Sequence, residues 1–255
     1  MTASLLAILL TGIMVASGLS GVNTVLPLAI LVIVFWALYR YPRRKVGYTL
    51  GTLGGYVLAF LFPVLVLGTL SATAWGFGQI TMSNPQWQSI AREMAIIAAF
   101  TFVVAIITEE GFFRGWLWAA FSDAGLNKST VVILTSLAFS IWHAPEVFLS
   151  KEFSLPIVQA LVLLINAVVI GAIWAILRDL SGSLLVSSFS HGIWNAGAYV
   201  LFGDGAAKGA LGIENTTVLG PEHGFLGLAF NLVFLVVLWK SWESRNRAVV
   251  RYSIV

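Results

Sequence analysis

The chain has no cysteine among its 255 residues. A sequence without thiols cannot form a disulfide framework, a thiolate nucleophile or a cysteine metal site. Charge is also scarce, because charged residues make up 10% of the sequence, against about 25% in soluble domains. The net charge is only +3, and no basic stripe with interleaved aromatic residues occurs, which argues against a nucleic-acid partner.

Hydrophobic residues make up 59% of the chain. The mean hydropathy of the chain is +0.93. The apolar runs are long and continuous rather than short and alternating, which predicts membrane-spanning helices instead of a β-barrel. The predicted fold class is therefore an all-α integral membrane protein, a bundle of about eight transmembrane helices with a buried polar site. We expect residues 1–255 to form a single membrane-embedded domain.

The eight spans are expected at Ser4–Leu19, Val22–Tyr39, Thr49–Ala72, Ala91–Ala120, Ser129–Trp142, Pro156–Leu177, Ser183–Phe202 and Phe225–Trp242. No Lys or Arg precedes Arg40, so the first run is interpreted as a span rather than a signal peptide. The fourth run is long enough for a tilted helix that protrudes beyond the bilayer. The fifth is expected to continue to His143 and to end at Pro145.

Basic residues orient the predicted bundle. With the N-terminus inside, eleven Lys and Arg residues lie on the cytoplasmic side and three, Arg92, Lys151 and Lys208, lie outside. The positive-inside rule favours this partition, and an odd number of spans would scramble it. We expect a multi-pass protein of a prokaryotic plasma membrane with both termini in the cytoplasm. His223 is expected to be a surface residue of an outside loop.

Three charges lie together in the fourth predicted span: Glu109, Glu110 and Arg114. A charged side chain at bilayer depth costs at least ~2.5–3.5 kcal/mol on insertion scales, which suggests that these three are retained for chemistry. Glu110 and Arg114 are four residues apart, share a helix face and suit an ion pair, whose role could be purely structural. Glu109 lies about 100° around the helix and faces a different neighbour.

Two further spans carry polar motifs. His143 follows Phe139 in the fifth span, and His191 lies one helical turn before Asn195 in the seventh. Counting from the predicted cytoplasmic ends at ~1.5 Å per residue places all of these groups at overlapping depth. Three helices are therefore expected to form one polar site.

Such a set supports two kinds of hydrolysis. A carboxylate with a neutral histidine can activate water while imidazole and amide N–H groups stabilise an oxyanion. Alternatively, Glu109, His143 and His191 are sufficient ligands for zinc with a fourth position open for water. From other classes of function, a proton-coupled transporter and a non-catalytic immunity or scaffold protein remain open. The transporter lacks support from internal repeats or paired broken helices.

The three motifs, Glu109-Glu110-x-x-x-Arg114, Phe139-x-x-x-His143 and His191-x-x-x-Asn195, resemble in order those of the CPBP family. That family comprises type II CAAX prenyl endopeptidases and bacteriocin-processing or immunity proteins. The motif-bearing core covers residues 91–200.

The resemblance implies an intramembrane endopeptidase with a cavity open towards the cytoplasm. It implies that Glu109 is the general base, that His143 helps to activate water and that His191 and Asn195 stabilise the oxyanion. Glu110 and Arg114 complete the polar shell. We expect no metal cofactor, with zinc as the alternative. The expected partners are the lipid bilayer and a membrane-associated peptide or protein substrate.

Overall fold

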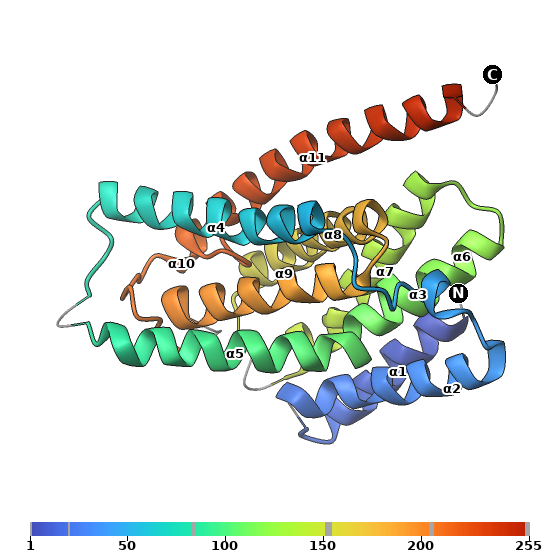
Figure 1. The fold of residues 1–255 in the computed structure, drawn as a ribbon. Coiled ribbons are helices and arrows are strands. Elements are labelled where there is room, and N and C mark those ends of the chain that lie inside the picture. The colour runs from blue at the N-terminus through green and yellow to red at the C-terminus, as the bar shows by residue number, and fades with distance from the viewer. Residues whose placement is uncertain (1, 20, 83–84, 151–154, 204–206, 253–255) are drawn as a thin grey trace.

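The computed structural model describes residues 2–252 except 20, 83–84, 151–154 and 204–206. Helices make up all the regular secondary structure of these described residues. The longer ones run roughly along one direction (Figure 1). In chain order the elements are α1 (Thr2–Ala16), η1 (Gly21–Val25), α2 (Leu26–Tyr39), α3 (Arg43–Val46), α4 (Leu53–Gly76), α5 (Trp87–Ile107), the π-helical η2 (Glu110–Leu117), α6 (Trp118–Asp123), α7 (Lys128–Leu149), α8 (Ile157–Ser181), α9 (Leu184–Gly197), the π-helical η3 (Ala198–Phe202), α10 (Thr216–Leu219) and α11 (Phe225–Tyr252).

Helix α8 forms the centre of the bundle, with most of its side chains buried between α7, α9 and α11. Helix α9 packs on the other side of α8 and also contacts α4 and α5. Helix α1 packs along α7, and α2 contacts η2. The many apolar side chains exposed on α2, α4, α5 and α11 therefore form the outer surface of the bundle, as expected where lipid is the solvent.

The all-α membrane fold is confirmed, and each of the eight predicted spans is helical. Within the described residues, five helices are long and apolar enough to cross a membrane: Leu53–Gly76, Trp87–Asp123, Lys128–Leu149, Ile157–Ser181 and Phe225–Arg247. Two shorter apolar helices are Thr2–Ala16 and Asn23–Tyr39. The first, second and seventh predicted spans are thus helical but do not meet the length and apolarity of a full crossing.

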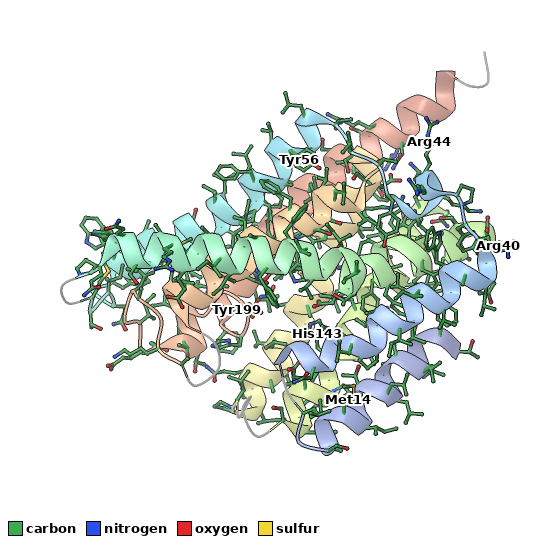
Figure 2. The ribbon with its side chains drawn as sticks, turned by 60° about the horizontal axis from the view of Figure 1, so that its bottom comes forward. Met14, Arg40, Arg44, Tyr56, His143 and Tyr199 are labelled. Carbon is green, nitrogen blue, oxygen red and sulfur yellow. The ribbon has the colours of Figure 1, made fainter. Side chains whose placement is uncertain are left out.

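One end of the bundle, here called the basic end, comprises the connections 40–52, 124–127 and 182–183. Polar caps start three helices there: Thr52 accepts from the Gly55 N–H, Asn127 from that of Thr130 and Ser183 from that of Leu185. Such caps satisfy backbone donors that a helix start leaves open. Arg40 and Arg44 mark this end in Figure 2.

Ion pairs tie the connections of the basic end together. Lys45 pairs with Asp123, and Lys128 Nζ lies 2.9 Å from Asp179 Oδ2. Arg178 Nη2 donates to the Lys45 carbonyl at 2.6 Å. The opposite end comprises η1, Ser150, Ala207 and the turn 220–224.

The prediction that Pro145 ends the fifth span is wrong, because α7 continues to Leu149. A proline inside a helix removes only one backbone donor, and neighbouring helices in a membrane protein compensate. Here α1 supports the proline: a Cβ added to Gly12 would lie 3.8 Å from the Pro145 ring. His143 consequently lies within α7 and not at its end.

Candidate active site

The first motif lies where the fourth predicted span departs from α-helical geometry. Helix α5 ends at Ile107, and the Thr108 hydroxyl donates back to the Val104 carbonyl at 2.8 Å. The chain then continues through the π-helical segment η2. Wide turns of this kind occur often at functional sites because they redirect side chains. In this chain, Glu109 lines a cavity, whereas Glu110 is fully buried.

Glu110 and Arg114 form the ion pair that their spacing predicts. Arg114 Nη1 lies 3.1 Å from Glu110 Oε1, and both side chains are fully buried. Arg114 Nη2 also donates to the Gly171 carbonyl of α8 at 3.1 Å, and its guanidinium lies 4.2 Å from the centroid of the Phe139 ring. A buried charge is tolerable only when it is paired and hydrogen-bonded, as here.

His191 lies between the two adjacent carboxylates. Its Nε2 is 3.9 Å from Glu109 Oε2, and its Nδ1 is 3.4 Å from Glu110 Oε1. The ring stacks on Trp174 of α8 with 4.0 Å between centroids. Through His191 the partly buried Glu109 and the fully buried Glu110 are linked to α9.

His143 is oriented by its own helix. Its Nδ1 lies 2.8 Å from the Phe139 carbonyl oxygen, which can only accept a hydrogen bond. The proton of the neutral ring is therefore on Nδ1, and Nε2 carries the free lone pair. Edge contacts with Phe139 and Trp142 hold the ring in this position. His143 thus offers a proton-accepting nitrogen.

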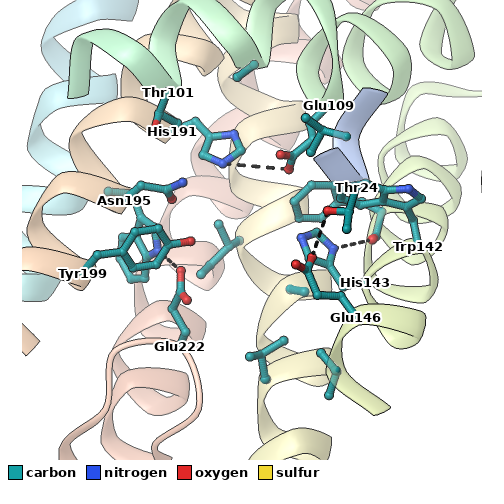
Figure 3. A pocket seen from close by; sticks show the side chains of 18 of the residues that line it. Thr24, Thr101, Glu109, Trp142, His143, Glu146, His191, Asn195, Tyr199 and Glu222 are labelled. Atoms are coloured by element: carbon teal, nitrogen blue, oxygen red, sulfur yellow. Dashed lines mark hydrogen bonds and ion pairs between the residues drawn. The ribbon is translucent and has the colours of Figure 1, made fainter. Parts of the chain in front are cut away.

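A cavity of about 630 Å³ brings the three motifs together. Its lining contains four of the six predicted site residues, Glu109, His143, His191 and Asn195. Figure 3 shows Glu109 and His143 on one side and His191 and Asn195 on the other. The remaining two lie behind the wall, where Glu110 approaches His191 and Arg114 lies against the Phe139 ring.

The sequence analysis missed several polar residues of the cavity wall, among them Glu146, Tyr199 and Glu222. Glu146 comes three residues after His143 and Tyr199 four after Asn195, so helical spacing could have found both. Glu146 accepts a hydrogen bond from the Thr24 hydroxyl at 3.4 Å. Glu222 accepts one from the Trp194 indole at 2.8 Å. No spacing pattern links Glu222 to a motif, because it lies in a connection.

The expectation that His223 is a surface residue is wrong. Its side chain is buried, with 7% exposed, in the turn before α11. Asn166 of α8 donates to the Pro221 and Glu222 carbonyls, both at 2.9 Å, and so fixes this turn against the bundle. Burial lowers the pKa of His223 below its usual value.

The zinc alternative requires three side chains that converge on one point. Among the residues that the structure describes, no three His, Asp or Glu side chains are arranged so that they could hold a metal ion. Glu109 and His191 do approach each other, at 3.9 Å. Zinc held by Glu109, His143 and His191 stays an alternative prediction.

The cavity reaches the opposite end of the bundle. Its lining includes Thr24 and Val25 of η1, Ser150, Ala207 and Glu222, and none of the described connections of the basic end. Two expectations therefore disagree in this structure: that the basic connections are cytoplasmic and that the cavity opens towards the cytoplasm.

The fold and the cavity together define a multi-pass helical membrane protein with a buried polar site that can activate water. Residues 91–197 match the family model described as Rce1-like, type II CAAX prenyl endopeptidase. The match contains all six predicted site residues, and it confirms over this segment the resemblance that the three motifs indicate. Over this segment the chain is thus similar, in general terms, to intramembrane endopeptidases of the CAAX-protease type. No curated protein matches the chain significantly.

Proposed function

We propose that this endopeptidase hydrolyses a peptide bond of a membrane-associated or lipidated substrate with water activated by Glu109 and His143. The observation that carries the proposal is the cavity whose wall holds Glu109, His143, His191 and Asn195, contributed by three separate elements. The matched family's description as prenyl endopeptidases supports a substrate anchored at the bilayer. Apolar residues of the cavity wall, such as Phe100 and Val104 of α5, suit such a substrate.

In the first step, a water molecule between Glu109 and His143 attacks the scissile carbonyl carbon. Glu109 takes one proton from the water, and His143 Nε2 accepts a hydrogen bond from the other O–H. A new C–O bond forms, and the carbonyl oxygen becomes an oxyanion. Collapse of this intermediate breaks the C–N bond, and Glu109 gives its proton to the departing amine.

The oxyanion is stabilised from the other wall. The Asn195 amide can donate a hydrogen bond to it, and His191 Nε2 can do so when the ring is protonated on both nitrogens, with Nδ1 directed at the Glu110 carboxylate. The Glu110–Arg114 pair acts indirectly, because Glu110 lies 3.4 Å from His191 Nδ1 and holds the ring in position. We therefore assign positioning roles to Glu110 and Arg114 and catalytic roles to the four cavity residues.

Replacement of the general base tests the assignment. We expect Glu109→Gln to lower cleavage by ~10²-fold or more, because removing a general base costs that much. Membrane fractions of cells carrying the wild-type or the variant chain are compared by quantitative proteomics. The variant should accumulate a precursor that the wild type converts.

Glu93→Gln is the matched control, since Glu93 lies exposed on the same helix. It should leave the precursor fully processed. Normal processing in Glu109→Gln, at wild-type amounts of the protein in the membrane, would contradict the proposed role.

We further propose that the reaction needs no metal. Purified protein treated with a strong chelator should retain its cleavage activity on the precursor identified above, and elemental analysis should find less than one zinc per chain. Loss of activity that zinc alone restores would overturn this proposal.

A further inference from the structure

The cavity and the basic residues lie at different ends of the bundle. Ten of the fourteen Lys and Arg residues belong to the basic end or to the helix ends beside it: Arg40, Arg43, Arg44, Lys45, Lys128, Arg178, Lys240, Arg245, Arg247 and Arg251. Among the described residues, only Arg92 and Lys208 belong to the opposite end by their place in the chain, and Lys151 lies outside the described residues. The remaining one, Arg114, is buried in the site. By the positive-inside rule, the basic end faces the cytoplasm.

The cavity extends away from that end. Along α7, at ~1.5 Å per residue, His143 lies about 22 Å from Lys128 and Ser150 about 33 Å. Both residues line the cavity, together with Thr24, Ala207 and Glu222 of the opposite end. Figure 3 shows Glu146 and Glu222 beyond the catalytic groups on their respective sides.

Towards the basic end the bundle is closed beneath the catalytic groups. Leu117 and Trp118 are buried there, and Arg178 donates to the Arg114 carbonyl at 3.0 Å. Arg178 also donates a hydrogen bond to the Lys45 carbonyl, which connects residues 40–52 to α8. None of the described connections of that end belongs to the cavity lining.

We infer that the catalytic cavity opens to the non-cytoplasmic side of the membrane. Its substrate class is then a membrane-anchored or exported peptide presented at the outer face, not a lipidated protein of the cytosol. The substrate part of the inference rests on the proposed function. The orientation of the cavity rests on charge distribution and geometry alone.

The absence of cysteine makes this orientation directly measurable. We choose Ala207→Cys at the opposite end and Ala124→Cys at the basic end, two exposed alanines. Each full-length variant is expressed in a bacterial host, and intact spheroplasts are treated with a membrane-impermeant maleimide. Ala207→Cys should be labelled in intact spheroplasts, and Ala124→Cys only after permeabilisation. The reverse pattern, or labelling of both in intact spheroplasts, would overturn the inference.

A second matched pair examines the cavity itself. Thr101 lines the cavity, whereas Thr130 lies in the first turn of α7 at the basic end. A small impermeant methanethiosulfonate added outside should modify Thr101→Cys and not Thr130→Cys. An unmodified Thr101→Cys that becomes reactive from the cytoplasmic side would overturn the inference. Cysteine labelling does not require peptide cleavage. The test of cavity orientation therefore does not depend on the result of the Glu109→Gln test of the proposed function.

Discussion

At the scale of single residues, the two neighbouring glutamates of the first motif have different environments. Glu109 borders the cavity, while Glu110 is enclosed with Arg114 behind the wall and approaches His191. The division follows from where the side chains lie, since a general base needs water and a structural carboxylate needs a fixed cation.

The buried pair should be strongly coupled in stability. We expect Arg114→Met to destabilise the protein by ~3–5 kcal/mol, because Glu110 would remain buried without its cation. The double variant Glu110→Gln with Arg114→Met should recover part of this loss. Unfolding in detergent, followed by helical circular dichroism, measures both. A double variant that loses as much as the two single variants combined would contradict the coupling.

The six motif residues could be predicted from the sequence because charges and imidazoles are conspicuous in apolar spans. Helical spacing also predicted that Glu109 faces a different neighbour from the paired Glu110 and Arg114. The further polar wall residues were not found: Glu146 needed α7 to continue past Pro145, and Glu222 needed the tertiary placement of a connection. His223 was misplaced for the same reason, since its burial depends on packing of a turn against α8.

At the scale of elements, the site depends on the close approach of α5 and α9. Gly192, next to His191, makes this approach possible: a Cβ added there would lie 2.5 Å from the Ala98 carbonyl oxygen. The helices can therefore bring Glu109 and His191 to opposite sides of one narrow space.

We expect Gly192→Ala to force α5 and α9 apart, with a cost of ~1–3 kcal/mol in stability. Cleavage should fall as well, because the distance from His191 to Glu109 changes. Gly68→Ala is the matched control in α4, where an added Cβ meets nothing within 4 Å. It should be neutral or stabilise slightly. Thermal unfolding and the cleavage rate are measured for the wild type and both alanine variants. Equal stability and equal cleavage in the two variants would contradict this account.

The positions of the helices could be predicted because each is a continuous apolar run. The π-helical segment η2 could not, since its sequence is compatible with an ordinary helix and its wide turn comes from packing against neighbours. The length of α7 was misjudged because Pro145 was weighed as a local helix breaker without its support from α1.

At the scale of the whole molecule, the opposite end is held by a buried turn that carries Glu222 into the cavity. Asn231 of α11 and Asn166 of α8 meet beneath it, with 3.0 Å between the Asn231 Nδ2 and Asn166 Oδ1 atoms. His223 is buried in the same turn.

The turn should make stability depend on pH. The pKa of His223 is lowered by burial from its usual 6.5, so below about pH 6.5 the unfolded chain binds a proton that the folded chain excludes. Folding stability should therefore fall as the pH falls through this region, and His223→Gln should show a shallower fall. Thermal unfolding of both proteins between pH 8 and pH 5 measures the two slopes. Identical slopes would show that this histidine does not titrate differently on folding.

The direction of the cavity could not be predicted from the sequence. Motif spacing gives the depth of a residue along its own helix. It does not show at which end of the bundle the connections leave the cavity open. The resemblance implied one direction and the arrangement of basic residues implies the other, and only the placement of Thr24, Ser150 and Glu222 on the cavity wall brings the two into conflict.

The packed floor beneath Glu109 and His191 also has a kinetic consequence. Because the described lining reaches one end of the bundle and not the other, we expect the substrate to enter and both cleavage fragments to leave on that side. A fragment that stays anchored in the bilayer then competes with the next substrate for the same opening. Turnover of this enzyme is therefore expected to be governed by the exit of its anchored product, with inhibition that grows as cleaved material accumulates in the membrane.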